Sequence, residues 1–206
     1  MSDLMSLSAR ELDALRETAS IGAGHAATAL SQMTGSRIMI SVPQITIASL
    51  EEMPHQIVDA EEPIAAVMMQ MLGDLTGRSL LVFPRPTALR LAHLMLRRPQ
   101  PPNAPFGELE QSALKEAGNI LSGAYLNALS EFLGLMLLPS PPSLVVDMSA
   151  AVLSTAYAQF GAERDMVFAV ETDFLFDEQD DSLRGFFLLL PDLASLRVIL
   201  RAIRVS

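Results

Sequence analysis

The stretch SALKEAGN, residues 112–119, decides how the chain can be organised, because a similar stretch, DALRETAS, occupies residues 13–20. Both have the composition of a helix, and they are offset by 99 residues (112 − 13). A repeat that keeps its order and spacing predicts two copies of one structural unit. Residues that recur unchanged at this offset include Leu15 and Leu114, Ile21 and Ile120, Gly24 and Gly123, Ala29 and Ala128, Leu30 and Leu129, Ser31 and Ser130, and Gly35 and Gly134.

The composition excludes several classes of protein. The 206 residues carry a net charge of −10 and a pI near 4.7, whereas binding to a nucleic-acid backbone requires clustered Lys and Arg. No apolar run approaches the roughly 18 to 20 residues of a membrane span, and no signal peptide is evident. There is no cysteine for disulfides or thiolate chemistry. We therefore expect a cytoplasmic protein that binds no nucleic acid and does not insert into a membrane.

The first half predicts a definite order of elements. Ser8 and Glu11 form a capping box ahead of an amphipathic segment. β-Branched residues around Pro43 indicate strand, and the turn segment GDLTG, residues 73–77, indicates a hairpin. The expected elements are a helix of about 8–33, strand over 37–47, a hairpin of 64–72 and 78–83, and a helix of 86–97.

The second half repeats this order with an insertion. Further along the chain the repeat continues at an offset of 107 residues (191 − 84), so this half carries about eight extra residues. They fall near DMSAAVLSTAYAQF, residues 147–160, whose composition predicts an added helix. The expected elements are a helix of about 108–132, short strands flanking Pro142, a hairpin of 166–176 and 182–190, and a helix of 192–203.

The predicted fold is of the α/β class, in its α+β form, as a single domain over residues 1–206. Two interlocked halves, 1–98 and 106–206, are related by a pseudo-twofold axis. The strands are expected to be mostly antiparallel, because short hairpins connect them. The proline-rich segment 99–105 cannot continue a helix and is expected to be a linker.

Two other kinds of site find little support. GAGHAA, residues 22–27, has the form of a dinucleotide fingerprint, but that motif acts only between a strand and the helix that it opens. Here it lies inside a predicted helix, where small residues favour close helix packing instead. The three histidines, His25, His55 and His93, have no partner at a familiar metal-binding spacing. We expect neither a bound nucleotide nor a metal.

The repeated stretches carry polar residues along one face of their helices. Ser112, Glu116 and Asn119 are spaced i, i+4 and i+7, which places them on one stripe. Asn is costly inside a helix relative to Ala, so its position calls for a reason. A solvated polar face explains one copy, but both copies also place a proline 23 residues after the last member of the stripe (142 − 119 and 43 − 20). The equivalent residues are Asp13, Glu17 and Ser20, with Pro43 matching Pro142.

These residues resemble the active-site signature of the CheC, CheX and FliY family of chemotaxis phosphatases. The signature is an acid or Ser, three residues, Glu, two residues, Asn, then 22 residues and Pro. The second half matches it completely, whereas the first has Ser20 in place of Asn. IGAGHAATALSQMTG, residues 21–35, also resembles the segment after the first site in the CheC branch, with His25 where the family often has Asn. The similarity extends over essentially the whole chain.

The resemblance implies a phosphatase that hydrolyses the aspartyl phosphate of a CheY-type response regulator. It needs no cofactor of its own, because the regulator's acidic pocket and Mg²⁺ stabilise the phosphoryl group. Phosphoryl transfer gains much from orienting the attacking water, and a carboxamide has both a donor and an acceptor for this task. The implied roles are water positioning by Asn119, pairing of Glu116 with a cation of the regulator, and support by Ser112 and Pro142.

The resemblance also leaves alternatives open. The first site, with Glu17 and Ser20 supported by Asp13 and Pro43, is expected to be weakened or inactive, because serine lacks the two-ended geometry of an amide. A non-catalytic adaptor that binds a CheD-type receptor deamidase is a second function, with the added helix of 148–160 as its docking element. A flagellar-switch phosphatase of the FliY type is disfavoured, since the sequence ends at Ser206 without a further domain.

Overall fold

The computed structural model describes residues 8–41, 43–48, 61–99, 106–158, 167–176 and 182–205. His55, most of the expected linker, and the ends of the expected 147–160 helix and 166–176 strand lie outside them. In chain order the elements are α1 (Ala9–Thr34), β1 (Ile38–Ile40), β2 (Gln44–Ala48), β3 (Pro63–Gly73), β4 (Gly77–Pro84), α3 (Arg85–Met95), α4 (Glu108–Leu133), β5 (Leu137–Pro139), β6 (Ser143–Met148), α5 (Ser149–Ala158), β7 (Val167–Phe176), β8 (Ser182–Pro191) and α6 (Leu193–Val205).

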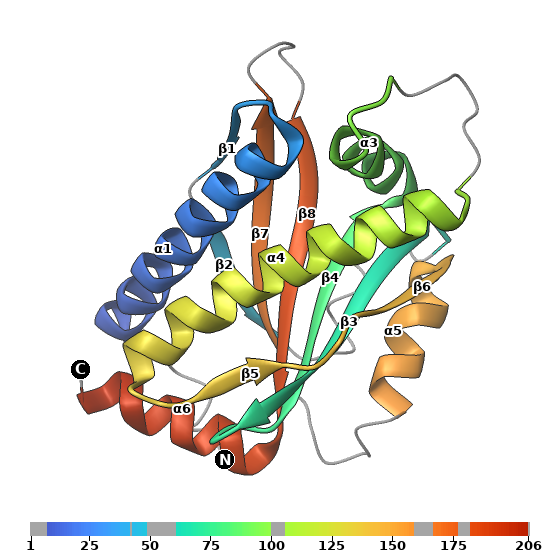
Figure 1. The fold of residues 1–206 in the computed structure, drawn as a ribbon. Helices are drawn as coiled ribbons and strands as arrows, with labels where there is room; N and C mark the ends of the chain where they lie inside the picture. The colour runs from blue at the N-terminus through green and yellow to red at the C-terminus, as the bar shows by residue number, and fades with distance from the viewer. Residues whose placement is uncertain are drawn as a thin grey trace.

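A single antiparallel sheet contains strands from both halves of the chain (Figure 1). β4 and β8 pair at its centre, with β3 and β7 on either side. The short strands β1 and β2 of the first half pair with β7, while β5 and β6 of the second half pair with β3. The halves therefore exchange their edge strands. The predicted α+β fold, with mostly antiparallel strands and two long helices, is confirmed.

Helices cover both faces of this sheet, so its central strands are buried on both sides. α1, α3, α4 and α6 pack on one face, where Val67, Leu81 and Phe187 belong to the larger core cluster. The other face contains Ala66 and Leu188, with α5 packed against it through Val152 and Leu153. Because both faces are covered, β4 and β8 read as nearly continuous apolar runs rather than alternating ones.

The turn between β3 and β4 depends on two glycines. Gly73 and Gly77 have φ angles of 111° and 152°, a region that favours glycine. A Cβ atom at these positions would lie 2.2 Å from the carbonyl oxygen of Met136 and 2.3 Å from that of Leu190. The predicted turn GDLTG is thus confirmed, although its two glycines belong to the strand ends.

The structure corrects two predicted boundaries. The strand expected over 37–47 is two short strands, because β1 pairs with residues 174–176 of β7 and β2 pairs with residues 167–171 of the same strand. The helix expected over 86–97 ends at Met95, and Arg97 has a left-handed φ of 53°. That bend directs the Arg97 guanidinium to the end of α1, where it donates hydrogen bonds to the carbonyl oxygens of Met33 (3.0 and 3.2 Å) and Gln32 (3.4 Å).

Candidate functional site

The two long helices lie side by side and run in opposite directions across the sheet (Figure 1). They pack tightly at Gly22, where an added Cβ would lie 2.9 Å from the ring of Tyr125. The N-terminal half of each helix consequently faces the C-terminal half of the other, with Glu17 near Phe132 and Glu116 near Met33. The two repeated stretches are therefore related by the pseudo-twofold axis.

The predicted stripe on α4 faces outward. Ser112, Glu116 and Asn119 are all exposed, and Pro142 is half-buried at the bend between β5 and β6. Among the described residues, none forms a hydrogen bond or ion pair with the side chains of Glu116 and Asn119. Both polar groups are thus free to meet an external molecule.

Close packing beneath this stripe brings α4 against the sheet. Gly118 is buried, and an added Cβ there would lie 2.6 to 2.9 Å from the side-chain carbons of Val67 on β3. The absence of a side chain lets α4 sit directly on the sheet. Asn119 lies about 100° further round the helix from Gly118, and its side chain is exposed to solvent.

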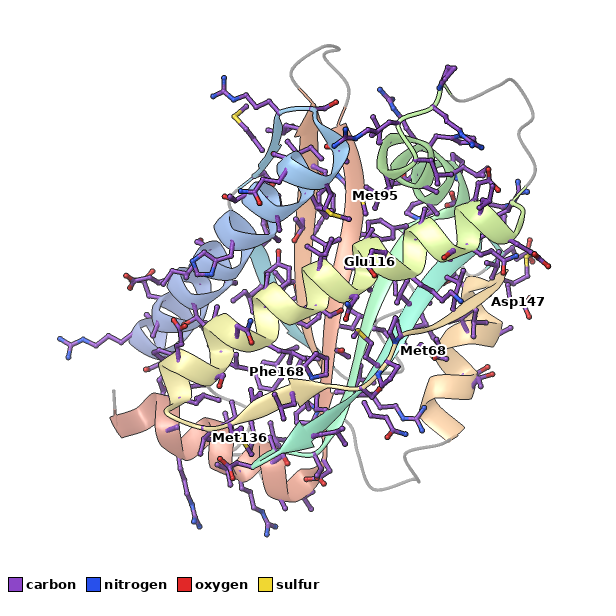
Figure 2. The ribbon with its side chains drawn as sticks, viewed as in Figure 1. Met68, Met95, Glu116, Met136, Asp147 and Phe168 are labelled. Carbon is purple, nitrogen blue, oxygen red and sulfur yellow. The ribbon has the colours of Figure 1, made fainter. Side chains whose placement is uncertain are left out.

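A hollow lies beside Glu116, bounded by three helices and the proline bend. Figure 2 shows Glu116 on α4 with Met95 of α3 near it. Exposed apolar side chains rim the hollow, including Met33 (44% exposed) and Leu109 (55%). The lining residues are Met33, Met95, Leu96, Leu109, Ser112, Ala113, Lys115, Glu116 and Pro142. An apolar rim around a carboxylate suits contact with another protein.

The first site has similar placement but different chemistry. Asp13, Glu17 and Ser20 are exposed on α1, whereas Pro43 is buried. The Ser20 hydroxyl donates a hydrogen bond of 2.8 Å to the carbonyl oxygen of Arg16 in its own helix. This bond holds the hydroxyl against the helix backbone, so it reaches less far into solvent than the amide of Asn119.

A second hollow lies at the first site, where the opposing helix brings another carboxylate. Glu17 and Glu131 both line it, together with the exposed Ile21 and the half-buried Phe132. At the equivalent place the hollow beside Glu116 has no acid opposite that residue, because Gln32 takes the position of Glu131 (131 − 99). The hollow beside Glu17 is therefore the more acidic of the two.

Two serines that the sequence analysis missed position the proline bends. The backbone N–H of Ser140 donates to the carbonyl oxygen of Gln70 (2.9 Å), and its Oγ accepts from the Gln70 N–H (2.9 Å). Ser41 makes the same pair of bonds with Asp173, at 2.9 and 3.2 Å. These serines also differ by 99 residues, so the repeat contained the signal. Each fixes its bend to a long strand of the other half.

Tyr125 lies under the contact between the two helices. Its ring stacks on Phe187 with a centroid distance of 4.8 Å, and its hydroxyl is 2.9 Å from Oγ1 of Thr172. Burial raises the pKa of Tyr125 to about 12, although the Thr172 hydrogen bond acts in the opposite direction. The phenol is therefore neutral at physiological pH and serves as a packed support.

The described residues offer no evident metal site. They contain no group of three or more His, Cys, Asp or Glu side chains that could hold an ion. His25 is exposed on α1, and His93 is buried in α3 without a hydrogen-bond partner. Neither lies with the candidate residues of the second site.

Comparison with known proteins identifies the family. A model of the CheC-like family matches residues 11–47 and 109–146, which contain all eight candidate site residues. The sequence is also 31% identical over 208 aligned residues, covering all of both chains, to the CheY-P phosphatase CheC of Bacillus subtilis. The chain belongs to the CheC-like family. A second CheC-like relative, the putative CheY-P phosphatase CheC1 of Halobacterium salinarum, is 25% identical over 162 residues, which cover 79% of this chain and 82% of that protein.

The CheC-like fold is shared with a solved structure. The crystal structure of FliY from Thermotoga maritima superposes with a TM-score of 0.77, at 23% identity, and covers 98% of this chain and 99% of that one. At this identity the likeness concerns the fold alone. For the described part of this CheC-like chain, no helix has a stretch long and apolar enough to cross a membrane.

Proposed function

We propose that this CheC-like protein is a phosphatase that hydrolyses the aspartyl phosphate of a CheY-type response regulator, and so ends or adapts a chemotaxis signal. Of the two relatives described above, one is named CheY-P phosphatase CheC and the other putative CheY-P phosphatase CheC1. The observation that carries the proposal is the outward stripe of α4, where Glu116 and Asn119 are exposed and their side chains form no hydrogen bond or ion pair with any residue that the structure describes. The cytoplasmic location expected from the sequence is part of this proposal.

The proposed mechanism gives Asn119 the task of orienting water. Its amide would hold the attacking water in line with the phosphorus, while the regulator's own acidic residues and Mg²⁺ stabilise the phosphoryl oxygens. A loose transition state places little covalent demand on the phosphatase, so correct placement of the water provides the rate enhancement. No general base and no cofactor of this chain is required.

Glu116 and its hollow would hold the regulator in place. The carboxylate would pair with a cation of the regulator's active site, at a distance where desolvation on docking strengthens the attraction. The apolar rim formed by Met33 and Leu109 would contact the regulator's surface around that site. Ser112 and Pro142 would shape the near side of the hollow.

The test is release of inorganic phosphate from a phosphorylated CheY-type regulator with Mg²⁺. We expect the native protein to accelerate release, and Asn119→Ala to lose about 100-fold of that acceleration, since the water is no longer oriented. Glu116→Ala should mainly weaken binding and therefore raise KM.

Asn127→Ala is a matched control for this test. Asn127 is exposed on the same helix two turns beyond Asn119, so the same substitution removes an amide outside the proposed site. Its activity should equal that of the native protein. If no cognate regulator loses phosphate faster with the native protein than without it, the phosphatase proposal fails.

α5 supports a second candidate function, which is docking of a CheD-type deamidase. The helix packs on the sheet through Val152 and Leu153, and its exposed residues Ala150, Ala151, Ser154 and Thr155 are small. Exposed Met148 precedes it on β6. A smooth helical surface next to an apolar side chain suits protein docking and lies apart from Asn119.

Co-purification separates the two functions. A CheD-type protein that docks on α5 should be retained equally by the native protein and by Asn119→Ala, and should be lost from a variant with Ala151→Glu. If Asn119→Ala abolishes retention or Ala151→Glu leaves it unchanged, docking at α5 is wrong.

A further inference from the structure

Two glycines in the middle of the long helices call for an explanation. Gly24 and Gly123 each follow the last residue of a site stripe, Ser20 or Asn119, by four residues. With Glu116 and Asn119, Gly123 completes the spacing i, i+3, i+7 and lies on the same outward stripe. Glycine is the least favourable residue inside a helix apart from proline, so its presence needs a cause.

The internal packing of the protein does not supply that cause. Neither glycine has a positive φ, and a Cβ added at either position meets no atom of the described residues within 4 Å. Gly22 and Gly118 differ in this respect, because an added Cβ would lie 2.9 Å from Tyr125 and 2.6 Å from Val67. Gly24 is exposed and Gly123 is half-buried, and the space that a side chain would fill at either position is open.

The other repeated residues have roles within the fold. Leu15 and its counterpart Leu114 are buried in the core. Gly35 and Gly134 end their helices in the left-handed conformation. Gly24 and Gly123 have no such internal role, and each follows a candidate site stripe. Ile21 is 47% exposed, whereas its counterpart Ile120 is half-buried and packs against the core.

We propose that Gly123 provides clearance for the phosphorylated regulator, whose backbone or bulky side chain lies against α4 at this position. The inference rests on the proposed function. Asparagine has a short side chain, so its amide reaches a phosphoryl group in the partner's pocket only if the partner's surface almost touches the helix. Gly123 is about 6 Å farther along the helix axis, within that contact area. A side chain there would hold the two surfaces apart and leave Asn119 short of the water.

The test uses Gly123→Ala and Gly123→Leu, with Gly24→Ala as the matched control. All three remove a helix-interior glycine in open space, so Gly123→Ala and Gly24→Ala should raise the melting temperature by about 2 to 4 °C. Binding is measured with the regulator carrying beryllofluoride and Mg²⁺ in place of the phosphoryl group, and turnover by phosphate release.

The expected result is a more stable protein that works less well. Gly123→Ala should weaken binding about threefold to tenfold and Gly123→Leu more than tenfold, as expected for an overpacked contact. Gly24→Ala should leave both binding and turnover near the native values.

Three results would overturn the proposal. Native binding and turnover in Gly123→Leu would show that no partner comes close to α4 there. An equal loss in Gly24→Ala would show that the effect is not specific to the second site, and a lower melting temperature in Gly123→Ala would show that the space is not open. A native protein that fails to dephosphorylate the regulator would instead refute the proposed function. The binding affinities of the native protein and its variants for the beryllofluoride-bound regulator would still test the role of Gly123.

Discussion

At the level of single residues, the two sites differ chiefly in what Ser20 and Asn119 can hold. The serine hydroxyl is bonded to the carbonyl oxygen of Arg16, whereas the amide of Asn119 is free among the described residues. An amide has a donor and an acceptor on a longer arm, so it can hold a water molecule in a fixed orientation.

Ser20→Asn should therefore restore the first site. In an Asn119→Ala background, where the second site has lost its amide, we expect Ser20→Asn to recover up to about half of the activity of a two-site protein. Phosphate release from the regulator measures this. If the double variant stays as inactive as Asn119→Ala while remaining folded, the regulator does not dock productively at α1. The acidic pair Glu17 and Glu131 would then be the next feature to test as the cause.

All eight candidate residues could be predicted from the sequence, because the repeat and its spacing are sequence features. The surroundings of these residues could not be predicted in this way. The bond from Ser20 to Arg16 depends on a side-chain rotamer, and the approach of Glu131 to Glu17 depends on how two helices 99 residues apart lie on the sheet. The catalytic roles themselves stay predictions.

At the level of elements, α4 packs closely on the sheet because Gly118 has no side chain. Gly118 lets the helix contact Val67 of β3, while the equivalent residue in α1 is Ala19. The two helices of the repeat therefore differ at this contact, and α4, which has the glycine, bears the complete signature.

Gly118→Ala should destabilise the protein by about 1 to 3 kcal/mol, because the new methyl group clashes with Val67. The destabilisation is a net one, because the clash outweighs the gain in helix propensity of about 1 kcal/mol that alanine has over glycine. Urea unfolding measures the change. Gly123→Ala on the same helix should shift stability in the opposite direction, and a gain in both variants would contradict the packing described for α4.

Element types were predictable from local patterns, but some boundaries were not. β-Branched residues indicated strand over 37–47 and turn residues indicated the hairpins. The break between β1 and β2 depends on Ser41 bonding to Asp173, a residue of the other half. A contact between residues so far apart in the chain cannot be predicted from the pattern of neighbouring residues.

At the level of the whole molecule, the halves share one sheet. β1 and β2 have their partner in β7, and β5 and β6 have theirs in β3. Either half alone would keep one hairpin with two unpaired edges, which is a marginal structure in water. The expected division at 99–105 stays a prediction, and separating the halves tests it.

Fragments 1–98 and 106–206 should each lack a cooperative unfolding transition when they are expressed alone at low concentration. Circular dichroism with thermal melting measures this, and sedimentation should show that any order gained at high concentration belongs to an oligomer. A fragment that melts cooperatively as a monomer would contradict the view that the edge strands are needed by the opposite half.

Joining the two halves in one chain affects how the sites can diverge. In a dimer of identical subunits a single substitution appears at both sites. Here Ser20 and Asn119 are encoded separately, so a mutation that silences one site leaves the other intact. The fold thereby permits a division of labour that a symmetric dimer forbids, in which one copy retains catalysis while its twin is free to acquire another binding specificity.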